Sequence, residues 1–207
     1  MIVSHAKQFI FFAVPKTGTH AVRELLSPHK GPDDWEQQIL FGQQQSPIAE
    51  IAKIQHGHIS AQQIVPYLEP AIWQSYYKFA IVRNPFDRFI SICFFLNRKN
   101  PQFLETPLQW MKSAITVPRF RARVLVRPQY LQLVDAQGNS AMDYIGRYEQ
   151  LQDSVDEICD RLQLKSTQLQ KRNTSEHNQY REYYDEELKS AVAEFYQEDL
   201  RRFNYCY

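Results

Sequence analysis

The chain has 207 residues, a formal net charge of +1, 43% hydrophobic residues and 23% charged residues. These values are typical of a globular protein and exclude disorder, collagen and a coiled coil for the chain as a whole. The near-zero charge gives no general attraction to nucleic acid, so we expect no nucleic-acid partner, and any anion site must be local. The length favours a single domain over residues 1–207.

The cysteines and the apolar runs bear on the compartment. Cys93, Cys159 and Cys206 are widely spaced and form no C-x-x-C pair, which favours a reducing environment. The longest strictly apolar run, residues 9–14, is far shorter than the ~20 residues of a spanning helix or the ~7–15 of a signal-peptide core. We therefore expect a cytoplasmic protein with no transmembrane segment.

The predicted elements alternate between strands and helices. In chain order we predict a buried strand at 9–14, a helix at 21–26, a surface helix and loop in the Gln-rich stretch 35–45, a short helix near 48–54, a helix at 61–68 capped by Ser60, a buried strand at 77–82, helices at 86–96 and 104–115, a strand at 141–146, a helix at 150–162 and a long helix at 185–203.

This alternation predicts an α/β fold with a mostly parallel central sheet flanked by helices. In such sheets, ligands bind beyond the carboxyl ends of the strands. The loops at 15–20 and 83–91 each follow a predicted buried strand. We therefore expect these two loops to line one crevice.

The loop after the first strand has the residues of an anion site. It leads into a helix, whose first backbone N–H groups and dipole favour negative charge. Gly18 allows close approach of a ligand, Lys16 adds positive charge, and Thr17 and Thr19 add hydroxyl donors. The motifs G-x-x-x-x-G-K-[ST] and G-x-G are both absent. An ordinary helix start with a surface lysine is the alternative.

The turn after the second buried strand offers another anion site. Arg83 supplies a bidentate fork for a phosphate, and Ser91 supplies a short hydrogen bond from the following helix. The alternative is a capped helix in which Arg88 pairs with Asp87 or another neighbour.

Together these segments resemble a known family. FFAVPKTGTH at 11–20 and FAIVRNPFDRFIS at 79–91 resemble the two donor-binding motifs of sulfotransferases that use 3'-phosphoadenosine 5'-phosphosulfate (PAPS). HGHIS at 56–60 and DYIGRYEQL at 143–151 are similar to segments of the carbohydrate branch, which includes heparan sulfate 2-O-sulfotransferase. The resemblance implies one sulfotransferase domain of P-loop-like architecture over 1–207.

The resemblance also implies roles for individual residues at the donor. Lys16 resembles the lysine that contacts the sulfonate-bridging oxygen, and Arg83 and Ser91 resemble the pair that binds the 3'-phosphate. His20 and Ala21 stand where the family usually has small hydroxyl residues. The loop that resembles the family's 5'-phosphosulfate loop consists of Thr17, Gly18, Thr19, His20 and Ala21.

The resemblance makes His58 the base that accepts the acceptor's proton, with His56 in support. Both imidazoles point to one side if the segment is extended, and the unperturbed pKa of histidine, near 6.5, suits this role. A metal site of His56, His58 and His20 is the alternative. Because no H-E-x-x-H motif or matching cysteine set is present, we expect no metal.

A basic stretch at 119–127 could recognise an anionic acceptor. Its four arginines are Arg119, Arg121, Arg123 and Arg127, and a solvated face paired with local acids is the alternative.

The expected activity is transfer of a sulfonate from PAPS to a hydroxyl acceptor, most simply a carbohydrate, by in-line attack with a histidine base. The product of the donor is 3',5'-adenosine bisphosphate. Two alternatives remain open: a nucleotide-binding module that does no chemistry, and a small P-loop-like kinase with a variant phosphate loop, which would need magnesium.

Overall fold

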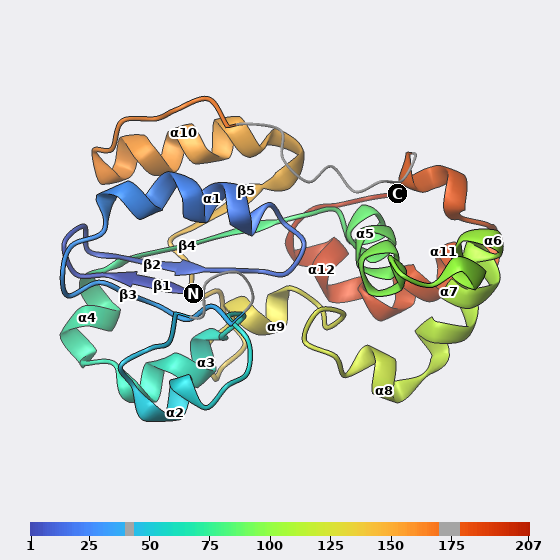
Figure 1. Ribbon diagram of the computed structural model, residues 1–207, viewed down its shortest axis with the longest axis horizontal. Coiled ribbons are helices and arrows are strands. Elements are labelled where there is room, and N and C mark those ends of the chain that lie inside the picture. Colours follow the sequence, from blue (N-terminus) through green and yellow to red (C-terminus); the bar gives the residue numbers. More distant parts are fainter. Residues whose placement is uncertain (40–43, 170–178) are drawn as a thin grey trace. The chain divides into compact units, whose positions relative to one another are not determined.

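The structure is a computed structural model that describes residues 1–39, 44–169 and 179–207 (Figure 1). The chain divides into two compact units. Unit 1 consists of Met1–Val82 and Leu131–Gln170, and unit 2 consists of Arg83–Tyr130 and Lys171–Tyr207. A single sulfotransferase domain over 1–207 stays a prediction.

Unit 1 contains a five-stranded sheet with the strand order β3-β1-β2-β4-β5. The pairs β2–β4 and β4–β5 are parallel, whereas β1 is antiparallel to both β2 and β3. The predicted α/β fold with a mostly parallel central sheet is confirmed. The strands are β1 (Ile2–Ser4), β2 (Phe9–Phe12), β3 (Trp35–Glu36), β4 (Tyr77–Val82) and β5 (Tyr144–Arg147).

The register of the parallel strands fixes which loops share an edge of the sheet. Phe12 of β2 pairs with Ala80 of β4, and Val82 pairs with Arg147 of β5. The carboxyl ends of all three strands therefore lie at the same edge of the sheet. In an α/β sheet this is the edge at which ligands bind.

Helices cover both faces of this sheet (Figure 1). α1 (Thr19–Leu26) and α10 (Leu151–Leu162) lie on one face, and α2 (Ala49–Ala52), α3 (Ala61–Ile64) and α4 (Pro70–Ser75) lie on the other. The first face holds the larger core of unit 1, whose members include Phe9, Phe11, Phe79, Val22, Leu26, Val155 and Ile158. On the second face Phe12 meets Trp73 of α4 edge-on, with 6.4 Å between ring centroids.

Unit 2 is helical within the described residues. Its helices are α5 (Pro85–Asn97), α6 (Pro101–Glu105), α7 (Pro107–Thr116), α8 (Pro118–Arg121), α11 (Glu186–Phe195) and α12 (Gln197–Arg202). The short helix α9 (Tyr130–Leu133) begins in unit 2 and ends in unit 1. α5, α7 and α11 supply much of a second core, which includes Phe89, Ile92, Met111, Leu188 and Val192.

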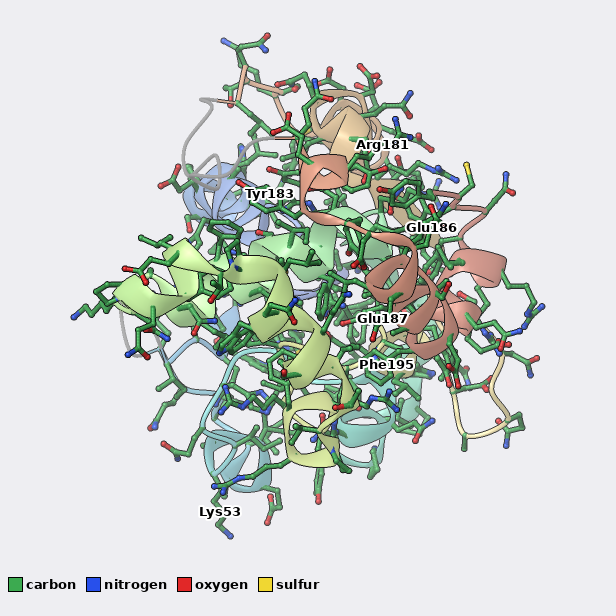
Figure 2. All side chains as sticks on the ribbon, turned by 90° about the vertical axis from the view of Figure 1, so that its right-hand side faces the viewer. Lys53, Arg181, Tyr183, Glu186, Glu187 and Phe195 are labelled. Atoms are coloured by element: carbon green, nitrogen blue, oxygen red, sulfur yellow. The ribbon has the colours of Figure 1, made fainter. Side chains whose placement is uncertain are left out.

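Four 3-10 turns complete the secondary structure of the described residues: Ser27–His29, Val65–Tyr67, Tyr148–Gln150 and Tyr180–Tyr183. The last of these precedes α11 in the chain. Figure 2 labels Arg181 and Tyr183 of this turn and Glu186 and Glu187 of α11. Tyr183 packs against Phe94 of α5, with 5.0 Å between ring centroids. This contact joins the turn to the core of unit 2.

Several predicted helices differ from the observed ones for local reasons. The predicted helix at 104–115 is two helices, because Pro107 cannot continue α6 and instead begins α7. The predicted helix at 185–203 is interrupted at Tyr196, whose φ of −104° and ψ of 22° are not helical. The cap at Ser60 is confirmed, since its side chain accepts from Gln63 N in a full capping box.

The prediction for the Gln-rich stretch was wrong where the structure describes it. Trp35 and Glu36 are not in a surface helix but form β3, a buried strand that pairs with β1. Residues 40–43 of the predicted helix lie outside the described residues. The strand predicted at 141–146 is observed three residues later at its start, as β5.

Candidate functional site

The loop between β2 and α1 has an unusual backbone. Lys16 has φ 66° and Gly18 has φ 78°, while Thr17 between them is not among the residues with positive φ. A lysine in the left-handed region is uncommon, whereas a glycine adopts it readily. Where left-handed and right-handed residues alternate, successive N–H groups can form a concavity suited to an anion, and two left-handed residues one position apart are compatible with such a turn. The sequence did not indicate the strain at Lys16.

Gly18 is favoured at its position chiefly by its left-handed backbone, and it also packs closely against side chains. Besides its left-handed backbone, a Cβ there would lie 2.9 Å from Cδ2 of Leu151 and 3.3 Å from the ring of Tyr148. These two residues belong to the segment after β5, so the loop packs against the neighbouring carboxyl-end segment of unit 1. The loop is therefore held in place by side chains as well as by its own turns.

Thr17 is fully buried, and its hydroxyl donates to Val14 O at 2.9 Å. The hydroxyl of Thr17 therefore joins the loop to the residues that follow β2. The sequence had led us to expect that this hydroxyl would donate to the ligand. The backbone N–H of Thr17 is then the donor that this residue can offer to an anion.

The first turn of α1 adds backbone N–H groups directly after this loop. Gly18 is the N-cap, no side chain caps the helix, and the first turn contains no acidic residue. Thr19, His20 and Ala21 are the first three helical residues, whose N–H groups have no acceptor within the helix. The positive end of the helix is consequently not neutralised by a carboxylate of its own first turn. Burial, and next the charge of Arg23, lower the pKa of His20, so this imidazole is neutral at pH 7.

His58 is tied to the residue that leads into this loop. Its Nδ1 lies 2.6 Å from Ala13 O, directly after β2. Burial lowers the pKa of His58 to about 3, so the ring is neutral at physiological pH. Because a carbonyl can only accept, Nδ1 carries the ring hydrogen and Nε2 keeps its lone pair. The structure thus fixes the tautomer that can accept a proton at Nε2.

His56 stabilises the segment that carries His58. The backbone N–H of His58 donates to Nδ1 of His56 at 3.3 Å, and the two ring centroids lie 6.1 Å apart. Between them, Gly57 passes so close to Gln37 that a Cβ would lie 2.3 Å from Gln37 O. Only glycine fits this approach, and the close packing fixes the path of the chain between the two histidines.

Gln132 is a member of this arrangement that the sequence did not reveal. Its Nε2 donates to Ala13 O and to Ile59 O, both at 3.1 Å, and its side chain is buried. Ala13 O therefore receives hydrogen bonds from both His58 and Gln132. No motif surrounds Gln132, which lies between Leu131 and Leu133 in α9, and no local signal could have identified it.

Arg23 was also missed. Its guanidinium is buried in an ion pair with Glu36 of β3, and Lys30 Nζ lies 3.1 Å from the other oxygen of Glu36. Burial lowers the pKa of Arg23 to about 10, which leaves it charged at pH 7. One Nη of Arg23 lies 3.2 Å from the position of a Cβ on Gly57, so a fixed positive charge borders the histidine segment.

The turn after β4 belongs to unit 2. Asn84 caps α5, with its Oδ1 accepting from Phe86 N, and Pro85 occupies the first helical position. Arg83 is buried, and its Nε donates to Oδ2 of Asp87 at 2.8 Å. Ser91 is buried two turns into the same helix. Sequence reasoning thus placed both residues correctly with respect to the helix.

The alternative for this turn supposed that Asp87 pairs with Arg88. In the described residues Asp87 instead pairs with Arg83. Arg88 is almost completely buried and donates to two backbone carbonyls, those of Arg127 (3.1 Å) and Leu125 (2.9 Å). It therefore holds the segment before α9 against α5, and it is Arg83 that uses the carboxylate of Asp87.

Comparison with protein families gives one decisive match. The model of the family described as "Sulfotransferase family" matches residues 1–206. The chain belongs to the sulfotransferase family. No curated protein and no solved structure shows significant similarity to it. As a sulfotransferase, the protein is a transferase of sulfonate groups, and the family implies a hydroxyl-bearing acceptor.

Two further findings describe the sulfotransferase. In the described ranges, no group of three or more His, Cys, Asp and Glu side chains is arranged to hold a metal ion, so the alternative metal site of His20, His56 and His58 is not found. No helix of residues 1–39, 44–169 and 179–207 is long and apolar enough to cross a membrane.

The basic stretch of the sulfotransferase is partly helical, since α8 covers its first residues. Arg121 donates to Ile115 O, and Arg127 donates to Ala122 O. Arg119 and Arg123 are exposed, and Arg123 lies over the ring of Phe120. Two of the four arginines thus use at least one N–H group to fold their own segment.

Proposed function

We propose that the protein transfers the sulfonate of PAPS to a carbohydrate hydroxyl, with His58 as the base. The observation that carries the proposal is the hydrogen bond between His58 Nδ1 and Ala13 O. This bond presents an unprotonated Nε2 from a segment anchored three residues before Lys16, at the loop whose backbone suits an anion. A proton acceptor and a phosphate-binding loop are the two parts that the reaction needs.

The family membership and the resemblance of the two motifs suggest donor-binding roles for two segments of the chain. The N–H groups of the loop from Thr17 to Ala21 bind the 5'-phosphosulfate, and Lys16 contacts the oxygen that bridges phosphorus and sulfur. Arg83 and Ser91 bind the 3'-phosphate. The support is the family membership, the alternating φ values of the loop, and the absence of an acid from the first turn of α1.

The reaction is an in-line displacement at sulfur. The acceptor oxygen forms a bond to sulfur while the bond from sulfur to the bridging oxygen breaks, and the electron pair of that bond goes to the phosphate. Lys16 and the loop N–H groups stabilise the charge that develops there. His58 Nε2 takes the proton of the acceptor hydroxyl.

The low pKa of His58 determines when the proton moves. A base with a pKa of about 3 accepts a hydroxyl proton only after the forming bond to sulfur has made that proton acidic. Binding of the anionic donor raises the pKa of a nearby imidazole and so improves the base when the substrate is in place. His56, which accepts from the backbone N–H of His58, holds the segment that carries the ring.

The donor is tested by calorimetry with 3',5'-adenosine bisphosphate against adenosine 5'-monophosphate. We expect the bisphosphate to bind roughly 100-fold more tightly, since two charge-assisted hydrogen bonds to the extra phosphate are worth about 3 kcal/mol. Equal affinities of the two nucleotides would remove PAPS as the donor.

The chemistry is tested by transfer of radiolabelled sulfonate from PAPS to a panel of glycans and lipids. We expect labelled glycan from the wild type, a loss of about 10²–10³ in kcat for Lys16→Ala, and about 10²–10⁴ for His58→Ala, with the fold retained. His58→Asn is the matched control, because its Nδ2 can still donate to Ala13 O but cannot accept the proton. Tight nucleotide binding without transfer to any acceptor would instead indicate a module that does no chemistry.

A further inference from the structure

The backbone of Arg83 is held by a side chain rather than by a neighbouring strand. Arg83 N donates to Oε1 of Gln129 at 3.0 Å, and Nε2 of Gln129 donates back to Arg83 O at 2.9 Å. The amide of Gln129 therefore satisfies both polar groups of the residue that follows β4. Only 1% of Gln129 is exposed, so water cannot take over either hydrogen bond.

Gln129 is held in turn by a carboxylate. Oδ2 of Asp199 accepts from the backbone N–H of Gln129 at 2.8 Å and from its side-chain Nε2 at 3.4 Å, and Oδ1 accepts from Tyr130 N at 2.9 Å. Asp199 lies on α12 and has no exposed surface. A carboxylate is buried at a large cost unless it is hydrogen-bonded, and here three N–H groups offset that cost.

The direction of the Arg83 side chain is fixed from its other end. Asp87, one helical turn later, accepts from Nε at 2.8 Å. Gln129 thus fixes the backbone of Arg83, and Asp87 fixes the orientation of its guanidinium. An arginine forms a bidentate contact with a phosphate only when its planar fork is correctly oriented, so both constraints bear on anion binding.

We infer that Gln129 and Asp199 are positioning residues for the 3'-phosphate, which set the selectivity for a bisphosphorylated nucleotide by holding Arg83 in its binding orientation. This inference rests on the proposed function. Neither residue touches the nucleotide. Asp199 acts through Gln129, and Gln129 acts through the backbone of Arg83.

The test is calorimetry of the full chain with 3',5'-adenosine bisphosphate and with adenosine 5'-monophosphate. Asp199→Asn replaces one accepting oxygen by an NH₂ group that faces an N–H donor, and Gln129→Met keeps the length of the side chain without its hydrogen bonds. For each variant we expect bisphosphate affinity to fall about tenfold, the weight of one weakened charge-assisted hydrogen bond, with monophosphate affinity unchanged.

Asp185→Asn is the matched control, because Asp185 is also a carboxylate of unit 2 that accepts from a backbone N–H, that of Leu188, but it does not contact Gln129. We expect this variant to keep the wild-type ratio of the two affinities. A lowered ratio in Asp185→Asn equal to that in Asp199→Asn would overturn the inference, since a general loss of stability would then explain both.

A double-mutant cycle separates positioning from mere support of the fold. In an Arg83→Ala background, Asp199→Asn should lower the ratio no further, because the residue through which it acts is gone. An additional tenfold loss in that background would overturn the inference. If the wild type shows no preference for the bisphosphate, the proposed function is refuted. If the wild type shows the preference and the folded variants Asp199→Asn and Gln129→Met both retain it, only the inference is refuted.

Discussion

Acidification should destabilise unit 1 through His58. In the unfolded chain the imidazole has a pKa near 6.5, while in the folded protein burial lowers its pKa to about 3. Since the folded pKa is the lower one, the stability that the neutral ring provides is complete above pH 6.5 and is lost as the pH falls toward 3. Between pH 7 and pH 5 this loss amounts to about 2 kcal/mol.

The matched variant is His58→Asn, which can still donate to Ala13 O but does not titrate. Urea unfolding followed by fluorescence in a Trp110→Phe background reports unit 1, because Trp35 and Trp73 are then the only tryptophans. The wild type should lose about 2 kcal/mol more than His58→Asn between pH 7 and pH 5. Equal losses in the two proteins, or an NMR titration of His58 near pH 6.5, would refute the reasoning.

Two further predictions concern the packing around the histidine segment. Gly57→Ala should lower the free energy of unfolding by about 3 kcal/mol, because the new Cβ would lie 2.3 Å from Gln37 O. The control Gly138→Ala, at φ 83° with no atom within 4 Å of the new Cβ, should cost only about 1 kcal/mol of backbone strain. Similar losses of the two variants in thermal or urea unfolding would contradict this. Gln132→Met should lower the free energy of unfolding by about 2 kcal/mol, and it should lower kcat more than it raises KM for the donor. The control Gln62→Met, which loses one exposed hydrogen bond, should change neither the stability nor the kinetic constants. Equal effects of the two variants in steady-state kinetics would remove the role of Gln132.

The sequence predicted the parts of the fold that depend on local patterns. The apolar run at 77–82 coincides with β4, and the polar loops that follow β2 and β4 lie where the alternation of strands and helices put them. The sequence also predicted that Gly18 lies in a turn between a strand and a helix. Such signals reside within ten to twenty residues and need no knowledge of distant partners.

Features that depend on distant partners could not be predicted. β3 exists because Trp35 and Glu36 pair with β1, and a Gln-rich neighbourhood concealed that pairing. The structural roles of Gln132 and Asp199 likewise depend on hydrogen bonds to carbonyls and N–H groups up to 119 residues away in the sequence. No local pattern in the sequence indicates which backbone group such a side chain will contact.

If Lys16 acts as proposed, its left-handed backbone opposes stability to activity at one position. A residue with a Cβ costs about 1 kcal/mol in that conformation, and glycine would remove the cost. Directed evolution for heat resistance alone should therefore replace Lys16 by glycine, and the resulting enzymes should melt later yet turn over poorly. A library screened for both properties should keep the lysine and collect its gains elsewhere in the chain.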